Sequence, residues 1–202
     1  MAEAQKLVEG SCDMVFLERF YRLLNIQGVS IQLPGDCNVA NIKGGGVSKI
    51  PKVLPELLQD IEDGNLQKLA VVADADHAGI SGGFSERWHQ LTAPLAEAGY
   101  DITPLPTEEY KGSLFEHQEG LPPVGLWIMP NHKDDGMLED LIIQTVCEGQ
   151  QSVLLDKAEK GLNELPVKLF GASRKTTSSC QSNGLYLVSM ARKTRARFNE
   201  CY

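Results

Sequence analysis

The chain has 202 residues, of which 42% are apolar and 23% are charged. This size and apolar share suffice for one medium-sized domain with a hydrophobic core and a tail. The formal net charge of -8 opposes tight binding to a polyanion such as nucleic acid. No apolar stretch is long enough to span a bilayer, and residues 1–6 lack the basic and apolar regions of a signal peptide. We therefore expect a cytoplasmic protein that does not associate with membranes.

Charge is distributed unevenly along the chain. Residues 1–173 hold 13 Lys and Arg against 26 Asp and Glu, whereas residues 174–202 hold 6 against 1. The first segment therefore carries -13 and the second +5. No broad basic patch in the first segment indicates non-specific nucleic-acid binding. We predict one domain over residues 1–173 and a separate basic tail over residues 174–202.

The cysteines indicate neither a zinc site nor a disulfide framework. They are odd in number and none forms a Cys-x-x-Cys pair: Cys12, Cys37, Cys147, Cys180 and Cys201. We expect them to be reduced and structural, as in most cytoplasmic proteins.

The first third of the chain alternates between strand and helix patterns. A short strand is predicted over residues 7–9 and a second over 29–33, with a helix between them. The predicted buried face of that helix consists of Phe16, Phe20, Leu23 and Leu24. The run Gly44-Gly45-Gly46 suits either a plain turn or a loop that contacts phosphate. Residues 50–61 predict a helix despite two prolines.

The alternation continues through the rest of the chain. A strand over residues 68–74 precedes a helix that presents Trp88, Leu91, Leu95 and Ala98 on one face and stops at Gly99. Residues 103–123 are rich in proline and charge and predict a surface loop. A strand over 125–129 precedes helices near 137–146 and up to 165. Alternating strands and helices favour an α/β, Rossmann-like three-layer fold with a central, mostly parallel sheet and right-handed crossovers.

The apolar run that ends at Asp74-Ala75-Asp76 is the most informative motif. The carboxyl end of a buried parallel strand opens onto the crevice where α/β proteins bind ligands. Two neighbouring carboxylates there are costly without a cation, and Mg²⁺ or Mn²⁺ is the usual partner of oxygen ligands. The pattern therefore indicates metal-assisted chemistry on a phosphate. The alternative is that an aspartate simply caps the following helix.

Three acidic segments are expected to share one edge of the sheet. Glu9 ends the first predicted strand, Asp74 and Asp76 end the third, and the loop 131–135 follows the last one. If these strands run parallel, their carboxyl ends lie together. The sequence thus predicts that Glu9 meets the two aspartates.

The pairing of Leu7-Val8-Glu9-Gly10 with Val71-Val72-Ala73-Asp74-Ala75-Asp76 resembles the toprim domain, the metal-dependent module of topoisomerases, bacterial primases and OLD-type nucleases. The surrounding residues also resemble a group of small stand-alone toprim-like bacterial proteins. Those residues are Asp13, Arg87-Trp88, Val124 to Pro130 and Gly136 to Asp140.

This resemblance implies roles for individual residues. Glu9 would transfer a proton and would also hold metal together with Asp74 and Asp76, making these three the catalytic residues. By analogy with OLD-type nucleases, Asp13 and Glu139 would complete two metal sites. Two ions about 4 Å apart could activate water and stabilise the leaving oxygen of a phosphodiester. The implied activity is that of a metal-dependent nuclease or nucleotidyl-transfer protein, with nucleic acid or a partner protein as its target.

Structural interpretations stay open for several of these residues. Asp13 could merely begin the first helix, and Glu139 could interact with the positive end of its own helix. Asp134 or Asp135 could be a helix N-cap rather than a ligand. His77 is expected to be incidental to the Asp pair.

Two other functions are compatible with the acidic motif. In an aspartyl phosphatase Asp74 would be the nucleophile and Asp76 the acid, but His77, Ala78 and Gly79 do not fit the residues usual in such enzymes. Alternatively, the acidic pocket could belong to a non-catalytic nucleotide- or protein-binding module of the phage-defence type.

The tail from about residue 175 lacks periodicity and differs in charge from the rest. We hypothesise a frameshift, since the codons of Met190-Ala191 must contain TGG when read one nucleotide later. The alternative is a disordered basic tail that touches nucleic acid. Sequencing the gene distinguishes the two.

Overall fold

The computed structural model describes residues 3–79, 82–106, 108–145 and 150–164. The chain divides into two compact units, Met1–Met137 and Leu138–Tyr202. The predicted boundary between residues 173 and 174, and the tail with its frameshift hypothesis, lie outside the described residues.

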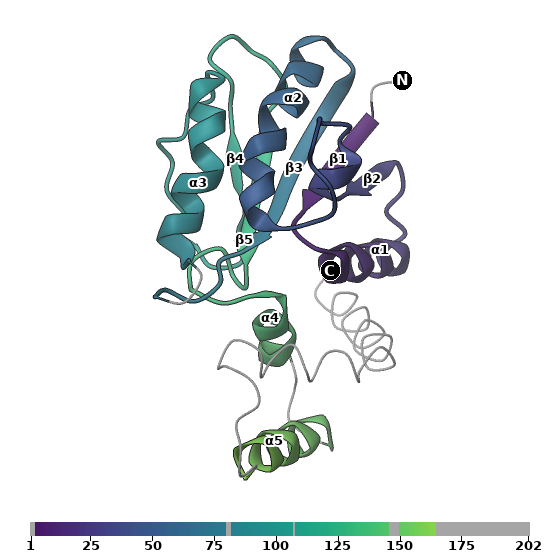
Figure 1. Cartoon of the computed structure of the whole chain (residues 1–202), viewed down its shortest axis with the longest axis vertical. Coiled ribbons are helices and arrows are strands. Elements are labelled where there is room, and N and C mark those ends of the chain that lie inside the picture. The colour runs from purple at the N-terminus through teal and green to yellow at the C-terminus, as the bar shows by residue number, and fades with distance from the viewer. Residues whose placement is uncertain (1–2, 80–81, 107, 146–149, 165–202) are drawn as a thin grey trace, which may run out of the picture. The chain divides into compact units, whose positions relative to one another are not determined.

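The first unit is built on a five-stranded sheet in the order β2-β1-β3-β5-β4 (Figure 1). Its strands are β1 (Glu3–Val8), β2 (Val29–Gln32), β3 (Leu66–Asp74), β4 (Ser113–Phe115) and β5 (Val124–Met129). β1 pairs in parallel with both β2 and β3, and β3 pairs in parallel with β5. The expected mostly parallel α/β sheet is confirmed, and the carboxyl ends of β1, β3 and β5 lie on one edge.

The segment 103–123 departs from the sequence prediction. It was expected to be a surface loop, but it contains β4, which pairs antiparallel with β5 and closes one side of the sheet. Phe115 of β4 is fully buried and packs on Trp88. A three-residue strand is too short for its alternation to stand out among prolines and charges, and burial of this single aromatic ring anchors it.

Helices cover both faces of the sheet. α2 (Ile50–Glu62) and α3 (Phe84–Glu97) contact each other, with α2 on β3 and α3 on β5. Their apolar side chains share one core with the alternate strand residues Leu7, Leu69, Val71, Ala73, Leu126 and Ile128. The buried Val8 and Val72 point the other way, toward the face covered by α1 (Ser11–Leu24). Two 3-10 turns, Pro34–Asp36 and Val47–Lys49, lie between β2 and α2.

The buried face of α1 differs from the prediction by one position. Leu17 is buried, whereas Leu24 is 41% exposed and Phe16, Phe20 and Leu23 are half-buried. The rings of Phe16 and Phe20 instead stack on each other with centroids 6.0 Å apart. A helix with apolar residues on more than one side leaves the phase of its buried stripe undetermined by sequence alone.

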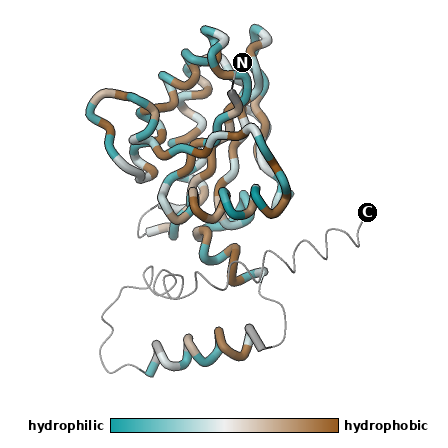
Figure 2. Tube along the Cα trace, turned by 90° about the vertical axis from the view of Figure 1, so that its right-hand side faces the viewer, coloured by the Kyte–Doolittle hydropathy of each residue, from teal (hydrophilic) through white to brown (hydrophobic). Residues whose placement is uncertain are grey.

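The second unit contributes α4 (Leu138–Gln144) and α5 (Gln150–Asn163) among the described residues. Hydrophobic and hydrophilic positions both occur along α5 (Figure 2), where Val153 and Leu154 are about half exposed. In the described part of the chain, no helix combines the length and apolar character needed to cross a membrane. Neither Cys12 nor Cys37 forms a disulfide, and burial raises the pKa of Cys37 to about 11.

Candidate functional site

Glu9 lies beside the two aspartates at the carboxyl edge of the sheet. It directly follows β1, and its Oε2 accepts a hydrogen bond of 3.3 Å from the backbone N–H of Asp74, the last residue of β3. The pairing of Val8 with Val72 in the parallel ladder sets this relation, because it brings the ends of the two strands to the same level. The sequence prediction that Glu9 and Asp74 meet is confirmed as geometry.

The electrostatic surroundings of Glu9 are unusual for a carboxylate. Burial is the main cause that raises its pKa from 4.5 to about 7, and the negative charges of Asp76 and Asp13 raise it further. The hydrogen bond from Asp74 and the positive charge of Arg87 act in the opposite direction. Glu9 is therefore half protonated near neutral pH, a state suited to accepting or donating a proton.

Asp13 belongs to the first turn of α1 and is buried. Its Oδ2 accepts the backbone N–H of Gly10 over 2.9 Å, so it stabilises the turn between β1 and α1. The structural interpretation, a residue that begins the helix, therefore applies. The negative charge of Asp13 also raises the pKa of Glu9, so Asp13 lies near Glu9. Glu9, Asp13, Asp74 and Asp76 are called the acidic group below.

The motif Asp74-Ala75-Asp76 is held by a buried arginine. Arg87 of α3 is 2% exposed and donates from Nε to the carbonyl of Asp74 over 2.9 Å. Its Nη2 donates to Asp76 Oδ2 over 2.8 Å. Asp76 has a positive φ of 61° and exchanges two backbone hydrogen bonds of 2.8 Å with Gly136. This departure from strand geometry turns Asp76 away from the line of β3.

Asp135 lies in the loop between β5 and α4, but its side chain caps the start of α3. Its Oδ1 accepts the N–H of Phe84, the first residue of α3, over 2.7 Å, and its Oδ2 accepts the N–H of Ala78 over 2.9 Å. These bonds lower the pKa of the Asp135 carboxyl. Asp134 accepts instead from the side-chain amide of Asn131. The alternative that one of these aspartates caps a helix therefore applies to Asp135, and the helix is α3.

His132, in the loop after β5, is a further buried titratable group. Its Nδ1 accepts the N–H of Ile128 over 2.9 Å, which leaves Nε2 to donate to Ser113 Oγ at 2.9 Å. The ring is surrounded by Phe84, Trp88 and Trp127. Burial lowers the pKa of His132 to about 4, so the ring is neutral and structural.

Glu139 is the remaining residue proposed from the resemblance. It lies in the first turn of α4, in the second unit, and is buried. Burial is the main cause that raises its pKa. The position of the second unit relative to the first is not determined.

Carboxylate oxygens are hard donors that match Mg²⁺ and Mn²⁺. Within the described ranges, no three His, Cys, Asp or Glu side chains are grouped as a metal cage. Mg²⁺ commonly binds through one or two carboxylates together with water and substrate phosphates, and the carboxylates at the ends of β1 and β3 offer that number. The donor chemistry of Glu9, Asp74 and Asp76 therefore fits the ion.

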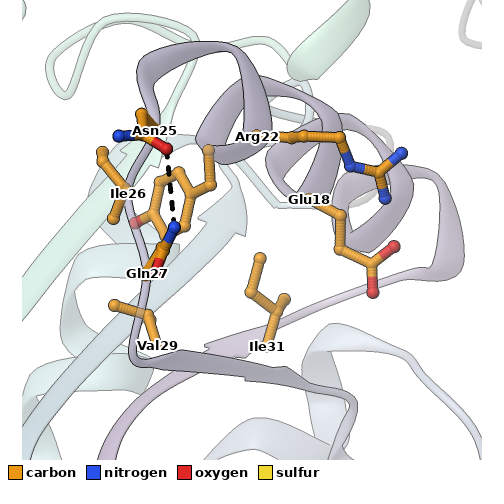
Figure 3. A pocket seen from close by; sticks show the side chains of 8 residues that line it. Glu18, Arg22, Asn25, Ile26, Gln27, Val29 and Ile31 are labelled. Carbon is orange, nitrogen blue, oxygen red and sulfur yellow. Dashed lines mark hydrogen bonds between the residues drawn. The ribbon is translucent and has the colours of Figure 1, made fainter.

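A separate pocket of about 410 Å³ lies where the second half of α1 meets β2. Its lining includes Glu18, Tyr21 and Arg22 of the helix and Val29 and Ile31 of the strand (Figure 3). It shares no residue with the acidic group.

The chain was also compared with known proteins. A family model described as "Protein of unknown function (DUF3226)" matches residues 5–179. The chain belongs to the DUF3226 family. Neither the curated proteins nor the solved structures gave a match. The DUF3226 match covers every described strand and helix except the first two residues of β1, Glu3 and Ala4, and extends six residues beyond the domain boundary predicted at residue 173.

Arg87 and Asp135 are the residues near the acidic side chains whose roles the sequence did not reveal. Arg87 appeared only as part of a resemblance, yet it lies on the buried face of α3 beside Trp88 and Leu91. A charged residue within an apolar stripe indicates a buried ion pair, and this signal could have identified it. Asp135 gave no such signal, because its partners are distant in sequence.

Proposed function

We propose that this protein binds Mg²⁺ or Mn²⁺ through Glu9, Asp74 and Asp76 and acts on phosphodiester bonds, as a nuclease or in a related nucleotidyl reaction. The observation that supports this most is the hydrogen bond between the Glu9 carboxylate and the Asp74 backbone. The negative charge of Asp76 also raises the pKa of Glu9, so Asp76 lies near it as well. This arrangement brings residues from separate strands into one acidic group, as the toprim resemblance implies.

The proposal gives each carboxylate a distinct task. Asp74 and Asp76 would hold the cation, which when bound would polarise a phosphodiester and its attacking water. Glu9 would move the proton, because burial raises its pKa to about 7, and in its ionised form it would complete the set of ligands. Asp13 is proposed as a ligand of a second ion, and it also shapes the turn after β1.

Arg87 would orient Asp76 rather than react. Its Nη2 engages Oδ2 of that carboxylate, and its Nε fixes the carbonyl of Asp74. Partners that orient ligating carboxylates typically change metal affinity by about 10- to 100-fold when removed. The same ion pair opposes the aspartyl phosphatase alternative, because Asp76 as the general acid would have to carry a proton beside Arg87.

The formal charge of -8 favours a second candidate, a non-catalytic nucleotide- or protein-binding module. For either function, a partner protein could supply specificity for nucleic acid. The cytoplasmic location expected from the sequence stays a prediction.

Two measurements on the full chain test the proposal. Calorimetry with Mn²⁺ measures metal binding directly, and incubation with plasmid, single-stranded DNA and RNA in Mg²⁺, Mn²⁺ or chelator measures cleavage. Glu9→Gln and Asp74→Asn should abolish cleavage, and Asp74→Asn should weaken Mn²⁺ binding by at least about tenfold. The exposed residues Glu56 and Asp60 on α2 provide the matched controls Glu56→Gln and Asp60→Asn, which should behave as wild type.

The outcomes separate the candidate functions. Mn²⁺ binding without cleavage of any polymer would favour the non-catalytic module. Tight binding of a beryllofluoride analogue of aspartyl phosphate would favour the phosphatase. Absence of Mn²⁺ and Mg²⁺ binding would overturn the metal-dependent proposal.

A further inference from the structure

We propose that the loop Lys43–Gly46, fixed by Lys49, is a backbone clamp that positions Glu9. The catalytic meaning of the clamp rests on the proposed function, whereas its effect on Glu9 can be measured without it. Gly45, Gly46 and Lys49 are thus positioning residues, which act through Glu9 and touch no reacting atom.

The loop grips the backbone of Glu9 directly. The N–H of Gly46 donates to the carbonyl of Glu9 over 2.7 Å, a short and therefore strong backbone hydrogen bond. Gly45 packs so closely that a Cβ built on it would lie 2.3 Å from the same carbonyl oxygen and 3.3 Å from the Cα of Gly10. Only glycine permits this approach, because any side chain would push the loop away from the end of β1.

Lys49 holds the loop in the shape that makes this contact possible. Its ammonium donates to the carbonyl of Lys43 over 2.6 Å and to the carbonyl of Gly45 over 2.7 Å. Hydrogen bonds from a charged donor are about twice as strong as neutral ones. Lys49 directly precedes α2, whose first residue, Ile50, is fully buried. The clamp is therefore anchored in the hydrophobic core.

The loop is also fixed from its other side. The N–H of Gly35 donates to the carbonyl of Gly44 over 3.0 Å, and a Cβ on Gly35 would lie 2.2 Å from the nitrogen of Gly44. The turn after β2 thus contacts the glycine loop through Gly35, and the loop in turn contacts the end of β1 through Gly45 and Gly46. Gly45 lies where two backbones touch, whereas Gly44 and Gly46 have positive φ angles of 64° and 123° that favour glycine. Close packing and backbone conformation therefore account for the Gly44-Gly45-Gly46 run.

The consequence for Glu9 follows from its two contacts. Its carbonyl is held by Gly46, and its side chain reaches across to the N–H of Asp74. Fixing the carbonyl fixes the direction in which the side chain leaves the backbone. Loosening the clamp should therefore release the bond to Asp74, although the loop and Asp74 belong to different elements.

Amide hydrogen exchange tests this coupling. In Lys49→Met, the amides of Gly46 and Asp74 should both exchange at least about tenfold faster, because the loop loses two charge-assisted hydrogen bonds. The amide of Val71, inside β3, should keep its wild-type rate. In Lys49→Arg, both amides should exchange almost as slowly as in the wild type. The control Lys52→Met removes an exposed lysine from the first turn of α2 and should change neither amide.

Gly45→Ala is a second, steric test that leaves Lys49 intact. It should accelerate exchange at the same two amides by displacing the loop from Glu9. Faster exchange at Gly46 with an unchanged rate at Asp74, in both variants, would show that the loop merely packs against β1 and would overturn the proposal. So would unchanged exchange at Gly46.

Mn²⁺ binding gives an independent readout of the same variants. Lys49→Met should weaken Mn²⁺ binding by about tenfold if the clamp serves the acidic site. A wild-type protein that binds no Mn²⁺ would refute the proposed function and leave the exchange measurement to decide the clamp. If the Asp74 amide exchanges faster in a variant but the Mn²⁺ affinity stays the same, the position of Glu9 does not affect metal binding.

Discussion

Arg87 donates to Asp76 over 2.8 Å from a side chain that is 3% exposed, whereas the side chain of Asp76 is 21% exposed. The arginine is thus sealed in the protein while the carboxylate keeps one side toward solvent. A buried cation that loses its anion is left unpaired in a low-dielectric setting. This asymmetry predicts that the stability of the fold and the geometry of the Asp74-Ala75-Asp76 motif depend on each other.

Asp76→Asn should lower the free energy of unfolding at pH 7 by about 3 kcal/mol, because it removes the carboxylate charge that Nη2 of the buried Arg87 engages. Arg87→Met should lower it by a similar amount. The double variant should lose less than the sum of the two, and urea denaturation of all four proteins measures the coupling. Strict additivity would contradict an energetic role for the pair.

Glu9→Gln should change how stability depends on pH. Between pH 4.5 and about 7 the folded chain holds a proton on Glu9 that the unfolded chain has released, so wild-type stability from this group falls as pH rises. Glutamine removes this loss. The variant should match the wild type below pH 4.5 and exceed it by about 2 kcal/mol above pH 7. Equal pH profiles in urea denaturation would refute the raised pKa.

His132 should make the protein sensitive to acid with the opposite sign. Between pH 6.5 and about 4 the unfolded chain takes up a proton on this ring and the folded chain does not, so stability is lost as pH falls. The loss should reach about 3 kcal/mol at pH 4. His132→Asn keeps an acceptor for the N–H of Ile128 and should flatten this slope, at the cost of lower stability at pH 7. His89→Asn, at an exposed position on α3, should keep the slope.

Asp135→Asn should loosen the start of α3. One amide oxygen can replace only one of the two acceptors, so either Phe84 or Ala78 loses its partner. The expected cost is about 1 kcal/mol, with faster exchange at the affected amide. Asp134→Asn is the matched control, since Asp134 bonds to Asn131 instead. Identical exchange at Phe84 and Ala78 in wild type and Asp135→Asn would disprove the cap.

The sequence predicts the sheet and the meeting of Glu9 with Asp74 because both depend on local patterns. Continuous apolar runs mark buried parallel strands, and their ends then fall on one edge. The face of α1 was predicted in part, since Phe16, Phe20 and Leu23 are half-buried, whereas Leu24 is exposed and Leu17 is buried in its place. Strand β4 was missed because Phe115 alone anchors it. Burial of these rings depends on tertiary contacts that periodicity does not encode.

The contacts around the site were hidden for a different reason. Gly46 touches Glu9 and Arg87 touches Asp76 only after the strands have paired. A single sequence shows a glycine run and a lone arginine, each compatible with many structures. Spacing along the chain carries no information about which distant backbone atom a glycine will approach.

The cap on α3 has a consequence for the order of folding. Asp135 reaches the first residue of this helix from 51 positions further along the chain, from the loop after β5. The negative charge that favours the amino end of α3 is thus absent until a long segment has closed and β5 has joined β3. We expect the first turn of α3 to consolidate late in folding, after the central strands have assembled.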